Sequence, residues 1–85
     1  MAIKITQKNK NVYEVEVSEK NTTFHEVTLD EETFEKLARG KTREKFIRNC
    51  FEFLLKREPK ENILSRFNVR VIREYFPEFE REIIE

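Results

Sequence analysis

The spacing of apolar residues along this 85-residue chain changes once, near residue 29, and that change is the strongest constraint on its fold. Apolar and polar residues first alternate in three segments: AIKIT (2–6), VYEVEV (12–17) and TTFHEVTL (22–29). Such alternation is typical of strands with one buried face. Apolar residues then recur every three or four positions, as in amphipathic helices. The sequence therefore predicts a single α+β domain, residues 1–85, with a sheet in residues 1–29 and a helical part in residues 30–85.

We predict that the three strands form an antiparallel meander, because only short polar turns separate them. Pairing Ile5 with Tyr13, and Val15 with His25, places the apolar side chains together on one face. The opposite face then carries mainly polar side chains: Lys4, Glu14, Glu16, Phe24, Glu26 and Thr28. A slip of one residue would exchange the two faces, so the pattern of burial tests this register.

About four helices are expected after the meander, which gives the element order β-β-β-α-α-α-α. Thr28 or Asp30 supplies the N-cap of the first helix, and Gly40, the only glycine, suits the left-handed position that ends a helix. Thr42 is expected to cap a longer second helix, which reaches about Glu58 before a proline stops it.

The remainder of the helical part is expected to hold a short helix in KENILSRF (60–67), with Ile63, Leu64 and Phe67 turned inward, and another helix in VRVIREYF (69–76). Asn68 between them can end the first and cap the second. Pro77 then interrupts the backbone hydrogen bonds and begins a last turn.

Positive and negative residues balance at 17 each, but they are unevenly distributed. Residues 1–35 carry 4 Lys and 8 Asp or Glu, a net charge of −4. Residues 36–73 carry 12 Lys or Arg and 4 Glu, which gives +8, and residues 74–85 carry one Arg and 5 Glu, which gives −4. The basic middle suits either an acidic partner or ion pairs with its own acidic flanks.

Features of a membrane or secreted protein are missing from the sequence. It has no run of 18 apolar residues, and its first ten residues lack the apolar core of a signal peptide. Cys50 is the only cysteine, so no internal disulfide can form. We therefore expect a cytoplasmic protein that does not enter a membrane.

Residues suited to catalysis or metal binding are scarce. Cys50 lies within the apolar stripe of the second helix, where a small core side chain is its expected role. His25, the only histidine, could meet it between sheet and helix, and this pair is the one catalytic alternative left open. One His and one Cys are too few for a zinc site, and a single glycine cannot form a Gly-rich phosphate loop. We predict a protein that is not an enzyme and that has no cofactor and no metal.

The segment HEVTLDEETFEKLARGKTREKFIRN (25–49) orders a strand, a short helix and a capped second helix. Over residues 25–58 the chain locally resembles ribbon-helix-helix proteins, in which the start of the second helix holds DNA phosphate. The resemblance makes four residues candidate anion or nucleic-acid contacts: Lys41, Thr42, Arg43 and Lys45.

Other features of the same segment argue against DNA binding. The face that would meet DNA carries Phe24 and Glu26, and carboxylates there oppose the phosphate backbone. The sequence pI of about 6.6 is also low for a DNA-binding domain. A nucleic-acid-binding regulator is therefore kept as the alternative function.

The second half, with FEFLLKREP (51–59) followed by ILSRFNVRVIREYFPEFE (63–80), resembles a group of short prokaryotic proteins of uncharacterised function. The similarity extends from the HEVTL strand onwards. It implies no activity and supplies no catalytic or ligand residues.

Bulky apolar residues gather near the C-terminus, in excess of what so small a domain readily buries. Those expected to contact a partner are Phe67, Tyr75, Phe76, Phe79 and Ile83. Exposed aromatic residues surrounded by charge are typical of protein interfaces, although the same residues could instead complete the core. The predicted function is protein–protein interaction, with another protein or with a second copy of the chain.

Overall fold

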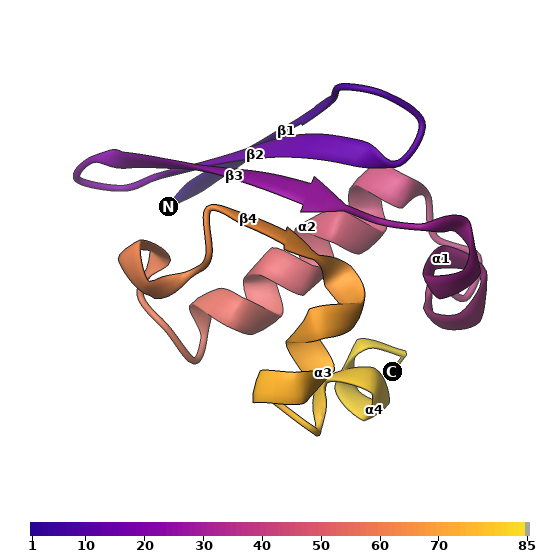
Figure 1. Ribbon diagram of the computed structural model, residues 1–85. Coiled ribbons are helices and arrows are strands. Elements are labelled where there is room, and N and C mark those ends of the chain that lie inside the picture. Colours follow the sequence, from indigo (N-terminus) through magenta and orange to yellow (C-terminus); the bar gives the residue numbers. More distant parts are fainter. Residues whose placement is uncertain (85) are drawn as a thin grey trace.

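The computed structural model describes residues 1–84, and its element order is largely the predicted one (Figure 1). Three strands come first: β1 (Ala2–Gln7), β2 (Val12–Ser18) and β3 (Thr22–Thr28). Two α-helices follow, α1 (Glu31–Leu37) and α2 (Arg43–Leu55). The last part contains η1 (Lys60–Asn62), β4 (Arg66–Asn68), η2 (Val69–Val71), α3 (Ile72–Tyr75) and α4 (Phe79–Ile83). The α+β class and the antiparallel meander of the first three strands are confirmed.

The predicted pairing of β2 with β3 is confirmed, whereas the pairing of β1 with β2 is wrong by two residues. Val15 lies opposite His25, but Ile5 lies opposite Val15 rather than Tyr13. In the turn between these strands, the Asn9 carboxamide oxygen accepts hydrogen bonds from the backbone N–H groups of Asn11 and Val12, both 3.1 Å. A shift of two residues leaves every side chain on its predicted face.

The sheet has a fourth strand that the sequence analysis did not predict. The helix expected in residues 60–67 is only the single turn η1, after which the chain extends and β4 pairs in parallel with β3. Glu26 donates its backbone N–H to the carbonyl of Ser65 at 2.8 Å, so the segment satisfies groups along the edge of β3. The sheet order is β1-β2-β3-β4, and the sheet is therefore not confined to residues 1–29.

All helices lie on one side of the sheet, and α2 crosses beneath it (Figure 1). The inner face of the sheet buries Tyr13, Val15, Val17 and Val27. Helix α2 buries Phe46, Ile47, Cys50, Phe51, Phe53 and Leu54 against this face and against the last helices. Within the described residues no helix covers the outer face, which exposes Phe24 among polar side chains, as the predicted register requires.

The helix ends largely follow the predicted caps. Asp30, not Thr28, caps α1 by accepting a hydrogen bond from the Thr33 backbone N–H at 2.8 Å. Gly40 has a φ of 85°, in the left-handed region that glycine adopts without strain. Thr42 caps α2 as predicted and accepts from the Lys45 N–H at 3.1 Å, but α2 ends at Leu55 rather than near residue 58.

Much of the basic middle of the chain pairs with the chain's own acidic residues. Arg57 donates to Glu78 at 3.1 Å and to Glu82 at 2.9 Å, which joins the end of α2 to α4. Arg73 pairs with Glu80 at 3.0 Å, which joins α3 to α4. The sequence left two roles open for the basic residues, contact with an acidic partner or ion pairs within the chain. Arg57 and Arg73 form ion pairs within the chain.

We expect acid to weaken the fold through Glu78. A hydrogen bond from its own backbone amide and another from Arg57 lower the pKa of Glu78. Stabilisation from a carboxylate with a lowered pKa is complete above the ordinary value, 4.5 here, and is lost as the pH falls through the folded-state pKa. Guanidinium unfolding between pH 7 and pH 3 should show this loss, with a smaller decline for Glu78→Gln. An equal decline in both proteins would contradict the assignment.

Within residues 1–84, no helix has both the length and the apolar character needed to cross a membrane.

Candidate functional site

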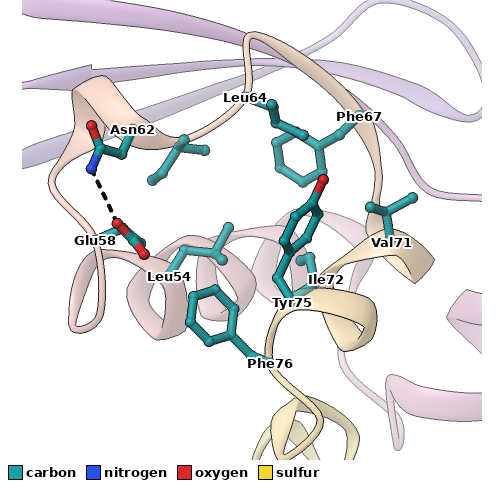
Figure 2. Close-up of a pocket in the computed structure, with 10 residues that line it drawn as sticks. Leu54, Glu58, Asn62, Leu64, Phe67, Val71, Ile72, Tyr75 and Phe76 are labelled. Atoms are coloured by element: carbon teal, nitrogen blue, oxygen red, sulfur yellow. Dashed lines mark hydrogen bonds between the residues drawn. The ribbon is translucent and has the colours of Figure 1, made fainter.

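An open apolar cleft of about 500 Å³ lies between the segment that leads into β4 and helix α3 (Figure 2). The end of α2 forms its floor, with Leu54 near the centre. The lining residues are mainly apolar: Leu54, Glu58, Asn62, Ile63, Leu64, Phe67, Val71, Ile72, Tyr75 and Phe76. A cleft of this volume with few polar groups is typical of a binding site.

Two buried polar side chains hold the first wall of the cleft, residues 60–67, against the sheet. His25 Nδ1 lies 2.8 Å from the carbonyl oxygen of Leu64, and Nε2 lies 2.9 Å from the Thr23 hydroxyl. Because a carbonyl oxygen only accepts, Nδ1 carries a proton and donates it to this bond. Lys60, which is buried, donates to Asn21 in the β2–β3 turn and to Glu61. The extended path of this wall therefore depends on contacts distant in sequence.

The second wall is formed by η2 and α3, which contribute Val71 and Tyr75, respectively, to the lining. Phe76 stands at its end and packs edge-on against Phe53 of α2, with ring centroids 5.9 Å apart. Tyr75 extends from α3 toward Leu64 and Phe67 on the opposite wall (Figure 2). Tyr75 is 65% exposed and Leu64 is 49% exposed, so each wall places a large apolar side chain at the mouth.

The five residues predicted to contact a partner divide between the cleft and the core. Tyr75 is exposed at the mouth, and Phe67 and Phe76 are half-buried in the lining. Phe79 and Ile83 are only 1% and 6% exposed, so the prediction of a contact surface is wrong for these two. They are buried because α4 folds back on α2, and Phe79 packs edge-on against Phe53 at 5.1 Å.

Leu64 is the cleft residue that the sequence analysis placed incorrectly. A helix over residues 60–67 would have turned its side chain toward the core. The extended backbone instead leaves it at the mouth of the cleft. Pro59 indicates the end of α2 but does not specify the extended path of residues 63–67, so no local signal placed Leu64 at the mouth.

The predicted anion-binding residues lie together at the start of α2, but they have contacts within the chain. Arg43 donates to the carbonyl of Leu29 at 2.9 Å, and its guanidinium lies 4.7 Å from the centre of the Phe34 ring. Lys41 lies 3.4 Å from the carbonyl of Ile83. The Thr42 hydroxyl caps the helix, and Lys45 is exposed.

The edge of β3 bears on the resemblance to ribbon-helix-helix proteins, in which this strand pairs with its counterpart in a second subunit. Here β4 lies along residues 26–28 of β3, with Glu26 opposite Arg66 and Thr28 opposite Asn68. A strand of a second copy would have to displace β4 to pair there.

The Cys50 and His25 side chains are both buried, and no hydrogen bond joins them among the described residues. Both ring nitrogens of His25 are occupied by Leu64 and Thr23. Burial raises the pKa of the Cys50 thiol, which keeps it protonated and therefore a poor nucleophile.

We expect Cys50 to resist alkylation in the native protein. The thiol is 1% exposed, so a reagent such as iodoacetamide should react only as fast as the chain opens. Mass spectrometry over time should show slow modification under native conditions and rapid modification in guanidinium. Equally rapid reaction in both conditions would contradict the buried position.

In residues 1–84, His, Cys, Asp and Glu side chains do not gather in any group of three or more that could hold a metal ion. No protein-family model matches the chain, and no curated protein or solved structure is significantly similar to it.

Proposed function

We propose that this chain is a non-enzymatic binding module that holds apolar side chains of another protein in the cleft between residues 60–67 and α3. The observation that carries the proposal is the pair of large apolar side chains, Leu64 and Tyr75, exposed on opposite walls. Exposed apolar groups that border a concave surface are typical of sites where proteins meet. We place this binding in the cytoplasm, because the single cysteine suits a reducing compartment.

The cleft supports protein binding better than it supports a small enclosed ligand. The two large side chains at its mouth are 49% and 65% exposed, so an occupant would remain in contact with solvent on that side. A side chain that projects from a larger partner meets this condition, because the rest of the partner covers the mouth.

The nucleic-acid alternative has weaker support. Two of its four candidate contacts, Lys41 and Arg43, donate to backbone carbonyls of the chain itself. Glu44 lies beside them in the first turn of α2 and opposes the approach of phosphate. No observation on the outer face of the sheet favours binding to bases.

Capture from lysate of the source organism tests the proposal. The bait is the full chain, compared with Leu64→Gln/Tyr75→Ser, in which both mouth residues are polar. We expect a protein, identified by mass spectrometry, that binds the wild type before and after nuclease treatment and is lost from the variant. Because both changes are at exposed positions, circular dichroism should show that the variant remains folded.

Other outcomes would overturn the proposal. Capture that is abolished by nuclease, and by Lys41→Glu/Lys45→Glu, would assign the chain to nucleic-acid binding. Capture that is equal for wild type and variant would move the binding surface away from the cleft.

A further inference from the structure

We propose that the segment bound in the cleft carries a lysine or arginine directly beside its apolar anchor, so that the partner presents a basic–apolar motif. This inference rests on the proposed function and specifies the chemistry of the partner at the same site. It follows from the charged side chains near the mouth of the cleft. Among residues 1–84, those near the mouth that form no ion pair are carboxylates.

One carboxylate in the lining of the cleft and one next to it in the chain have no cationic partner among residues 1–84. Glu58 lies in the lining, and its only hydrogen bond from a side chain comes from the Asn62 amide at 3.2 Å (Figure 2). Glu74 is not part of the lining, but it is exposed and directly precedes Tyr75 in α3, and no ion pair of residues 1–84 includes it. A partner cation that reaches either carboxylate forms an ion pair that the isolated chain lacks.

The cations near the cleft are already paired and cannot neutralise those carboxylates without breaking other contacts. Arg57 is held by Glu78 and Glu82, and it also stacks on the Phe53 ring at 3.6 Å. Arg73 of α3 pairs with Glu80 of α4 at 3.0 Å. The cations of the opposite wall are engaged as well, Lys60 with Glu61 and Arg66 with Glu26.

The exposed aromatic side chain of the sheet does not provide a matching anchor in a second copy. Phe24 lies directly opposite Glu16 on the outer face, in line with the neighbouring pair of Glu14 and Glu26. Its insertion would bring Glu14 and Glu16, which form no ion pair within residues 1–84, toward Glu58 and Glu74, and like charges repel. A separate partner with basic residues beside the anchor therefore fits better.

A selection from random dodecapeptides displayed on phage tests the inference. The full chain serves as bait beside two double variants, Leu64→Gln/Tyr75→Ser and Glu58→Gln/Glu74→Gln. We expect the wild type to enrich peptides with Lys or Arg next to a large apolar residue. The first variant should enrich none of these sequences, and the second should retain the apolar residue while losing the bias toward basic neighbours.

Affinity provides a quantitative measure. For a synthetic enriched peptide, calorimetry should give a dissociation constant about threefold to tenfold weaker with Glu58→Gln/Glu74→Gln, as expected for two partly exposed ion pairs. The control is Glu32→Gln/Glu35→Gln on α1, which removes the same charge from exposed positions outside the cleft lining and should leave the affinity unchanged.

The possible failures are distinguishable. Cleft-dependent peptides without basic residues would overturn this inference and leave the proposed function intact. Absence of any cleft-dependent peptide would overturn both. A concentration-dependent dimer on sizing that competes with the peptide would assign the cleft to a second copy rather than to a separate partner.

Discussion

Replacing Phe79 with alanine is expected to lower the free energy of unfolding by about 3–5 kcal/mol. Phe79 is fully buried and packs edge-on against Phe53, so truncation leaves a cavity between α4 and α2 that the short α4 cannot close. Domains of this size are stable by only about 5–15 kcal/mol, so the variant should be partly unfolded at elevated temperature. Guanidinium unfolding at low temperature, followed by circular dichroism, measures the change.

Tyr75→Ala is the matched control for Phe79, because both are aromatic residues of the same C-terminal segment. Tyr75 is largely exposed at the mouth of the cleft, so its removal should change the free energy of unfolding by about 0.5 kcal/mol or less. Comparing the free energies of unfolding of Phe79→Ala and Tyr75→Ala therefore distinguishes a core residue from a residue of the exposed surface. A small effect at Phe79, or a large effect at Tyr75, would contradict the division that the structure makes between them.

The elements that could be predicted from the sequence are those specified by local residues. The alternation of apolar and polar residues predicted which face of each strand is buried. That prediction holds despite the two-residue error in the pairing of β1 with β2, because a shift by an even number of residues keeps every side chain on the same face. The caps at Thr42 and the left-handed Gly40 were predictable for the same reason, since each depends on neighbouring residues alone.

The fourth strand could not be predicted because nothing in residues 60–68 specifies it locally. The apolar spacing of Ile63, Leu64 and Phe67 fits a helix as well as a strand. The outcome depends on the open edge of β3 and on His25 and Lys60, whose partners are separated from them by 39 residues. The cleft is a consequence of this strand, because the extended path leaves space in front of α3 that a helix would fill.

The sequence also could not predict which of the C-terminal aromatic residues line the cleft and which enter the core. Phe76 and Phe79 are three residues apart, and a continuous helix would place them on one face. Pro77 interrupts the helix between them, and Phe76 takes an extended φ of −133°. Phe76 therefore turns to the cleft, whereas Phe79 turns to the core. The sequence indicates the interruption at Pro77 but not the angle between the two helices.

His25→Ala is expected to lower the free energy of unfolding by about 2–4 kcal/mol and to release the first wall of the cleft selectively. The imidazole is buried against Phe51, with ring centroids 5.4 Å apart, so its loss leaves a cavity. It also removes the donor that the Leu64 carbonyl uses. Hydrogen exchange of backbone amides should therefore accelerate more in residues 63–68 than in β1 or β2.

Thr23→Val separates the two roles of His25. It removes the hydroxyl at Nε2 but leaves the ring and its bond to Leu64, so the exchange rates in residues 63–68 should stay near those of the wild type. If His25 only fills space, His25→Leu should restore both stability and slow exchange. If the bond to Leu64 holds the wall, His25→Leu should recover stability in part while residues 63–68 still exchange rapidly. The second result is the one that the geometry predicts, because a leucine at this position has no donor for the carbonyl.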